Sequence, residues 1–316
     1  MTLKNTLKNY FNSGSPDKRA KRRITGLVIA ITAVALVAAL LVLTVSSIAS
    51  AITNKKANQA DEGAPVSTAV ETVSGSLDDI KANLNSKITL VNMDGTVIAE
   101  SDVKTFIKSN RTNVGTENAP EYAYGSASNS IYTDALIIEA YNAFDKMACD
   151  FYADNNLQII VSRVYSTVMQ VSATYANGLT VKLHTSDEVG TNNFPNTIYG
   201  DDRYDWIYSN AANYGFVRVS NEEGYEDVFR YVGLANAKAI GNNTTLSEYL
   251  TSIRETSAES PKKVKAKPSL EEGAKNVDTY IYYVPYGESY DLPNPDKYTF
   301  SASDIGDGYI ITCFAK

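Results

Sequence analysis

The sequence predicts an α+β fold, a small antiparallel sheet with flanking helices. Segments with helical periodicity and segments with strand alternation both occur, but they do not follow one another in the regular β-α order of a doubly wound sheet. With 44% hydrophobic and 21% charged residues over 316 residues, the chain has enough apolar material for a packed core. One membrane-spanning helix is expected before this body, because residues 24–52 are uncharged.

Residues 24–52 contain no charged side chain, and about 20 such residues suffice to cross a bilayer. The preceding residues 1–23 carry seven Lys and Arg against one Asp. The positive-inside rule then places this basic tail in the cytoplasm and the body outside, as a single-pass protein of the cell membrane. A cleaved signal peptide is the alternative, because Ala49-Ser50-Ala51 resembles a cleavage site. The apolar run exceeds the usual 7–15 residues of such signals, which favours an uncleaved anchor.

The body is acidic, since the whole chain has a net charge of -7 despite its basic tail. An acidic body argues against nucleic acid as a partner, because phosphate contacts need a basic face. Residues 53–86 are rich in Ala, Ser, Asn, Asp and Thr, with a faint helical period. We expect them to form a partly helical stalk between the membrane and a domain at 87–256.

Several elements are predicted within residues 87–256. Asp94-Gly95 predicts a hairpin between two strands of Lys87–Ala99. Apolar spacing predicts a helix over Thr133–Ala153, with Thr133-Asp134 as its cap region. The further predictions are strands and helices in the order Leu157–Ser162 (strand), Gly178–His184 (strand), Tyr204–Asn213 (helix), Phe229–Val232 (strand) and Leu246–Ile253 (helix).

The charged segment 257–275 contains Pro261, Pro268 and five Lys, and is predicted to be a linker. A C-terminal β tail at 276–316 follows. Its predicted strands are Thr279–Pro285, Tyr298–Ser301 and Gly308–Phe314.

The order of segments resembles the VanY-type D-alanyl-D-alanine carboxypeptidases of bacterial walls, which are zinc peptidases. The resemblance covers most of the body. The last part of the body is similar to a tail often attached to such domains in Gram-positive bacteria. The segments that carry it are Ser162-Arg-Val-Tyr-Ser166, Ala173-Thr-Tyr-Ala-Asn-Gly-Leu-Thr-Val-Lys182, Trp206-Ile207, Tyr214-Gly-Phe216, Tyr225-Glu-Asp-Val-Phe-Arg-Tyr-Val-Gly233 and Ser301-Ala-Ser-Asp-Ile-Gly-Asp-Gly-Tyr-Ile-Ile-Thr312.

The resemblance also implies which positions should carry the chemistry, and all five are replaced. Family members bind zinc through two His and one Asp, with an open position for water. The first His falls at Tyr175, the Asp at Lys182 and the second His at Val228. The general-base Glu falls at Tyr225, and the Arg that holds the substrate carboxylate falls at Tyr165. An ammonium at Lys182 cannot donate a lone pair to a metal, so no zinc and no catalysis are expected.

The sequence offers fewer candidate residues for a rewired metal site, a serine nucleophile or a phosphate-binding loop. The one His of the chain, His184, lies near Asp187 and Glu188, and these three are weak candidates for a rewired metal site. Glu226 and Asp227 flank the lost Glu position, where we interpret them as solvated loop charges. No Gly-x-Ser-x-Gly elbow or phosphate loop is present.

The two cysteines of the chain, Cys149 and Cys313, could pair outside the cell or remain buried thiols. Three hypotheses for function follow. The first is a catalytically inactive VanY-like pseudoenzyme that binds stem peptides of peptidoglycan or an envelope protein. The second is a structural ectodomain that assembles envelope complexes. The third is an active peptidoglycan carboxypeptidase with a rewired metal site.

Overall fold

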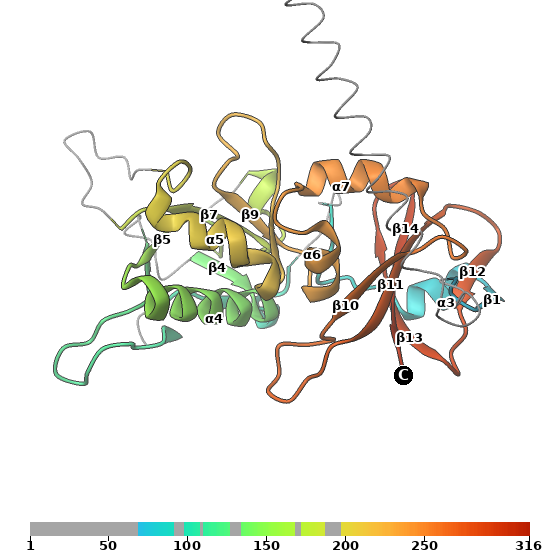
Figure 1. Ribbon diagram of the computed structural model, residues 1–316, viewed down its shortest axis with the longest axis horizontal. Helices are drawn as coiled ribbons and strands as arrows, with labels where there is room; N and C mark the ends of the chain where they lie inside the picture. Colours follow the sequence, from blue (N-terminus) through green and yellow to red (C-terminus); the bar gives the residue numbers. More distant parts are fainter. Residues whose placement is uncertain (1–68, 92–97, 108–109, 127–133, 168–171, 187–196) are drawn as a thin grey trace, which may run out of the picture. The chain divides into compact units, whose positions relative to one another are not determined.

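The computed structural model describes residues 69–91, 98–107, 110–126, 134–167, 172–186 and 197–316. Its described residues form four β-sheets with short helices around them (Figure 1). In this part of the chain no helix is long and apolar enough to span a bilayer. The predicted span at 24–52, the basic tail and the first part of the predicted stalk lie outside the described residues.

The central sheet has five strands in the order β3-β5-β7-β9-β8. Their bounds are β3 (Tyr124–Ser126), β5 (Ile159–Arg163), β7 (Thr180–His184), β9 (Val228–Tyr231) and β8 (Phe216–Arg218). Strands β5, β7, β9 and β8 pair antiparallel, whereas β3 and β5 pair parallel. The expected antiparallel sheet is therefore wrong at this edge. A helix lies between β3 and β5 in the chain, and such a crossover returns the second strand in the direction of the first.

That helix is α4 (Ile138–Asn155), which begins later than the predicted Thr133–Ala153. Residues Asp134–Ile137 form the strand β4 instead, in a small sheet β2-β4-β6 with β2 (Val103–Thr105) and β6 (Tyr165–Ser166). Leu136 and Ile137 fit the helical spacing, but a short buried strand gives the same apolar run. Consequently the predicted cap is also wrong: the residue before α4 is Ile137, and it makes no side-chain cap.

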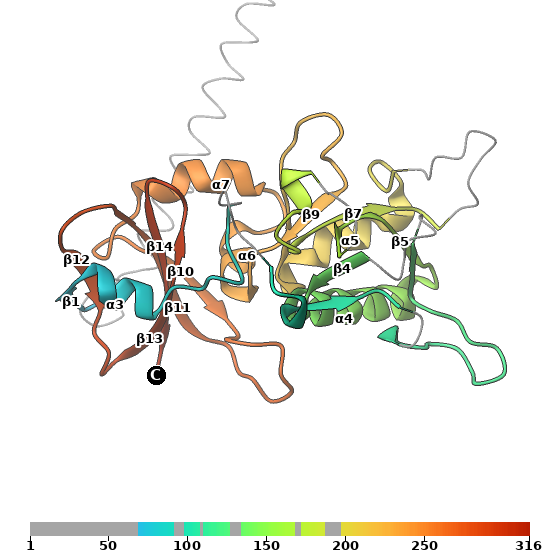
Figure 2. The ribbon, with the colours of Figure 1, turned by 180° about the vertical axis from the view of Figure 1, so that it is seen from behind.

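Helix α4 covers one face of the five-stranded sheet, and both views show it beside the strands (Figures 1 and 2). Its buried side chains pack with alternate residues of the strands in one cluster, which includes Phe144, Val181 and Phe229. Strand residues between these, such as Lys182 and Arg230, therefore lie on the opposite face of the sheet. We call that opposite face the open face, and it carries the candidate site.

The two remaining helices predicted for this region, Tyr204–Asn213 and Leu246–Ile253, are present. Helix α5 (Asp205–Asn210) continues into a 3-10 turn. Helix α6 (Leu234–Ile240), which was not predicted, follows β9. Helix α7 (Leu246–Ser252) begins at a capping box in which Thr245 and Glu248 bond reciprocally. The predicted hairpin is not confirmed: the described residues 87–91 and 98–99 are not strands, and its Asp94-Gly95 turn lies outside the described residues.

The C-terminal sheet has the order β10-β11-β14-β13. Strands β11 (Val277–Pro285), β13 (Tyr298–Asp304) and β14 (Gly308–Ala315) confirm the three predicted tail strands. Strand β10 (Lys262–Ala266), however, lies within the segment predicted as a linker. Its alternation explains the difference, because Lys263 and Lys265 point outward to Asp278 while Ala266 is buried.

Residues 69–86, predicted as the end of a stalk, also fold onto this sheet. Strand β1 (Thr72–Gly75) pairs with β12 (Tyr290–Pro293), and α3 (Leu77–Ala82) follows it behind a capping box (Figure 2). Ile80 of α3 is fully buried with Tyr282 and Ile311. The polar composition that indicated a stalk comes from the exposed side of these two short elements.

Both cysteines are free thiols: Cys149 is half-buried on α4 and Cys313 is buried on β14. Burial raises the pKa of both thiols, that of Cys313 to about 12. We therefore expect Ellman's reagent to detect two thiols per denatured, unreduced chain. In the native protein at pH 8, Cys313 should not react, because its thiol stays protonated. A denatured Cys313→Ser variant should report one thiol, and fewer than two in the parent chain would contradict the free state.

Candidate functional site

The structure places four of the five replaced positions around one end of β7 and β9. Lys182 on β7 and Val228 on β9 are direct partners in the antiparallel pairing. Tyr225 lies in the turn that leads into β9, and its carbonyl accepts a bond from the Val228 amide (3.1 Å). Tyr175 lies in a 3-10 turn before β7. Tyr165, by contrast, lies on β6 in the separate three-stranded sheet, opposite Ala135.

Tyr175 is buried, and burial raises the pKa of its hydroxyl to about 12. The charge of Arg163 lowers this pKa, whereas the charges of Asp227 and Tyr225 raise it further. These charges act on Tyr175 because the groups lie near it. Thr174, the residue before Tyr175, lines one cavity together with Tyr225.

Asp227 is the residue that the sequence interpretation placed wrongly. It was expected to be a solvated loop charge, but it is only 2% exposed. Its Oδ1 lies 3.3 Å from Lys182 Nζ, and its Oδ2 accepts a bond of 2.9 Å from Thr197 Oγ1. Its backbone carbonyl accepts a bond from Leu183 N (3.0 Å), which fixes the residue against β7. Only the pairing of β7 with the segment before β9 reveals this burial, so no local sequence signal marks it.

Lys182 makes two contacts with the turn before β9. Besides its ion pair with Asp227, its Nζ donates a hydrogen bond of 3.1 Å to Gly224 O. Its side chain is 23% exposed, so the pair sits largely out of water. The ammonium thus neutralises a buried carboxylate beside the positions where the family would hold a metal dication.

His184 lies two residues further along β7, with Nε2 3.8 Å from Asp227 Oδ2. Its proposed companions Asp187 and Glu188 lie outside the described residues. Within the described ranges, no group of three His, Cys, Asp or Glu residues is arranged to hold a metal ion. Among the described residues, the donor set around the family positions is one imidazole and one carboxylate, and that carboxylate already pairs with an ammonium. These residues do not fit zinc, which needs three lone-pair donors beside its water.

Glu226, the other carboxylate beside Tyr225, is half-buried and accepts a bond from Gly224 N (2.7 Å). It therefore tightens the turn before β9. Arg230, the Arg of the Phe-Arg-Tyr-Val-Gly segment, is buried on the open face. Its guanidinium donates to Thr89 O (2.8 Å) and to Thr180 Oγ1 (3.3 Å), so it ties the segment before the sheet to β7 and β9.

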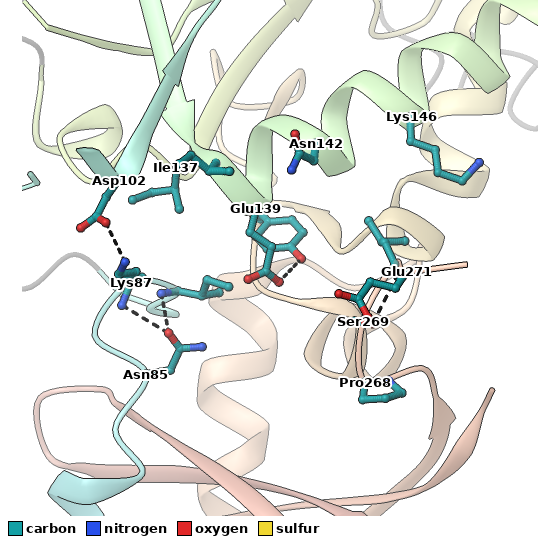
Figure 3. Close-up of a pocket in the computed structure, with 14 residues that line it drawn as sticks. Asn85, Lys87, Asp102, Ile137, Glu139, Asn142, Lys146, Pro268, Ser269 and Glu271 are labelled. Carbon is teal, nitrogen blue, oxygen red and sulfur yellow. Dashed lines mark hydrogen bonds and ion pairs between the residues drawn. The ribbon is translucent and has the colours of Figure 1, made fainter. Parts of the chain in front are cut away.

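Two cavities adjoin the sheet, one on each side. A cavity of about 390 Å³ on the open face is lined by Tyr225, Thr174 and Arg230 together with apolar side chains. The larger cavity, about 760 Å³, lies at the N-terminus of α4 and contains none of the five replaced positions (Figure 3). There Lys87 pairs with Asp102 (2.6 Å), and Tyr231 donates to Glu139 (2.7 Å). The larger cavity is therefore separate from the candidate site.

Comparison with known proteins gives distant similarities to solved structures. No protein-family model matches the chain, and no curated protein matches it. One similar structure is the vancomycin-resistance D,D-dipeptidase VanXYg in complex with a D-Ala-D-Ala phosphinate analogue. It shares 17% identity over 78% of this chain and 99% of its own, with a TM-score of 0.48.

The second is a VanY D,D-pentapeptidase variant from a VanB-type resistance cassette, in complex with Zn(II). It shares 17% identity over 52% of this chain and 99% of its own, with a TM-score of 0.32.

Proposed function

We propose that this chain is a membrane-anchored, extracytoplasmic pseudoenzyme that keeps a VanY-like carboxypeptidase framework for binding peptidoglycan stem peptides. The observation that carries the loss of catalysis is the Lys182–Asp227 ion pair of 3.3 Å, directly beside Val228. A zinc peptidase needs lone-pair donors and an activated water at this place. Here an ammonium, an isopropyl group and a buried phenol occupy the corresponding positions. The membrane anchor rests on the uncharged residues 24–52 and the basic tail before them.

We expect the purified full chain to contain no stoichiometric zinc. The physical reason is that Lys182 repels a dication and supplies no lone pair to it. Plasma mass spectrometry of the protein in detergent, after exposure to excess zinc and desalting, measures the metal content. The same sample should release no D-alanine from a stem pentapeptide at high protein concentration. One zinc per chain, or D-alanine release abolished by a chelator, would overturn the proposal in favour of a metal site that includes His184.

A wall-binding experiment separates the pseudoenzyme from a purely structural ectodomain. The full chain should be retained by purified cell wall that carries uncleaved stem peptides, and soluble stem pentapeptide should compete. Crosslinking in cells that recovers only protein partners, together with no retention on wall, would contradict peptide binding. That pair of results would favour the assembly role instead.

A further inference from the structure

A further cavity, of about 310 Å³, gathers lysine side chains at a distance from the replaced positions. It lies among α4, the 3-10 turn Ala211–Tyr214, α6 and the end of β10. Its lining contains none of the five replaced positions, and Lys146 lines both this cavity and the larger one (Figure 3). Among the described residues of its lining, Asp150 is the one carboxylate. The cations are Lys146, Lys238, Lys265 and Lys267. We call this cavity the lysine hollow.

The positive charge of the lysine hollow contrasts with the rest of the body. The whole chain carries -7, and its first 23 residues carry +6, so the other residues together carry -13. Such a body repels anions in general. A concave group of cations from three separate segments therefore creates a local attraction for an anion that the surrounding surface does not offer.

Two of the four lysines have no carboxylate partner among the described residues. Lys238 Nζ donates to the amide oxygen of Asn213 (2.9 Å), a neutral group that leaves the charge of the lysine uncompensated. Lys267 follows β10 directly, is exposed, and forms no ion pair with any described residue. Both ammonium groups can therefore approach an anion in the hollow without giving up an ion pair.

The other two lysines are only partly compensated. Lys265 Nζ lies 3.8 Å from Asp278 Oδ1, while Lys263 Nζ lies 2.9 Å from Oδ2 of the same carboxylate. One carboxylate thus serves two lysines. Lys146 pairs with Asp150 at 3.0 Å. An excess of positive charge remains in the lysine hollow after these pairs are counted.

We propose that the lysine hollow binds a ligand through a phosphate group that carries two or more negative charges. Four ammonium groups against one carboxylate favour a multivalent anion over a monoanion. The described lining holds no Arg, whose planar fork gives bidentate recognition of carboxylates, whereas Lys binds phosphate as a point charge. The volume is at the lower end of the range for ligand sites, which suits a compact anionic group. This inference does not rest on the proposed function.

The test is calorimetric titration of the full chain in detergent with inorganic pyrophosphate. Lys238→Gln/Lys267→Gln should weaken binding about tenfold, because it removes two cations of the hollow. Both side chains are exposed and outside any described ion pair, so the variant should fold as the parent does. Lys81→Gln/Lys297→Gln removes the same charge from exposed pairs elsewhere and should bind as wild type. Equal weakening in the two double variants would overturn the site, because overall charge alone would then explain the binding.

Asp150→Asn gives a readout that a merely structural role of these residues would not move. The variant removes the carboxylate of the described lining and keeps an oxygen that can accept the bond from the Tyr214 hydroxyl (2.6 Å). Pyrophosphate should bind about threefold more tightly, because a repelling charge is lost and Lys146 is released from its pair. Unchanged or weaker binding in Asp150→Asn would contradict the assignment of the hollow.

Three further probes identify the source of the phosphate group. Glycerol 3-phosphate and dihexanoyl phosphatidic acid carry the same phosphate monoester, without and with acyl chains. Binding of the soluble ester supports a soluble ligand, and binding of the lipid alone supports a lipid headgroup. An N-acetylated tetra-aspartate peptide that binds more tightly than pyrophosphate would overturn phosphate as the ligand in favour of an acidic peptide. No binding of any probe at millimolar concentration would overturn the inference.

Discussion

Replacing Lys182 with Met is expected to lower the free energy of unfolding by about 3–5 kcal/mol, because it leaves a buried carboxylate without its cation. Asp227 is 2% exposed, and the hydrogen bond from Thr197 Oγ1 does not supply the positive charge that the variant removes. The hydrogen bond from Lys182 to Gly224 O is lost as well. Urea unfolding of the full chain in detergent, followed by the fluorescence of its one Trp, Trp206, measures the change.

Two controls identify the cause of that loss. Lys81→Met removes a lysine from an exposed pair with Asp78, and it should leave the unfolding midpoint unchanged. The double variant Lys182→Met/Asp227→Leu removes both charges, and it should recover most of the stability, as buried ion pairs replaced by apolar groups often do. If Lys182→Met alone cost less than about 1 kcal/mol, Asp227 would have to be solvated, against the buried placement described above.

Replacing Gly215 with Ala is expected to lower the free energy of unfolding by about 2–4 kcal/mol. Gly215 has φ +86°, a left-handed conformation that is strained for any L side chain. A Cβ there would also lie 2.5 Å from Cε2 of Tyr231, whose ring is buried at the end of β9. The Tyr231 hydroxyl is held by Glu139, so the ring cannot move away without breaking that bond.

Gly224 supplies a matched control for the conformational part of this effect. Its φ is +87°, but a Cβ there meets nothing within 4 Å. Gly224→Ala should therefore cost about 1–2 kcal/mol, the price of the left-handed conformation alone. Equal losses in the two variants would show that the contact with Tyr231 contributes nothing to the loss at Gly215.

The same contact explains why two of the resembling segments occur together. Tyr214-Gly-Phe216 brings Gly215 under the Tyr231 ring, and Phe216 pairs with Tyr231 in the sheet. Phe216 also packs against Phe144 of α4 at a centroid distance of 6.3 Å. These residues hold strands β8 and β9 against the helix. None of these residues is one of the five positions at which the resemblance implies chemistry.

The sequence alone predicted most elements whose pattern is local. Alternation identified β7, short apolar runs identified β5 and β9, and the spacing of apolar residues identified the body of α4. The prediction from sequence failed where a short apolar run fits both the helical and the strand period, as at Leu136 and Ile137. It failed also where polar composition hid a paired strand, as in β1 and β10. Pairing with a distant partner decides such cases, and no local window contains that partner.

For the site, the sequence by itself determined which residue types stand at the family positions, and with them the expectation that zinc is lost. Only the tertiary structure decided where the remaining charges lie. It buried Asp227 against Lys182 and used a bulge to bring Arg163 beside them. The physical reason is that register and burial depend on contacts between strands far apart in the chain, whereas the chemistry of a side chain is fixed by its identity.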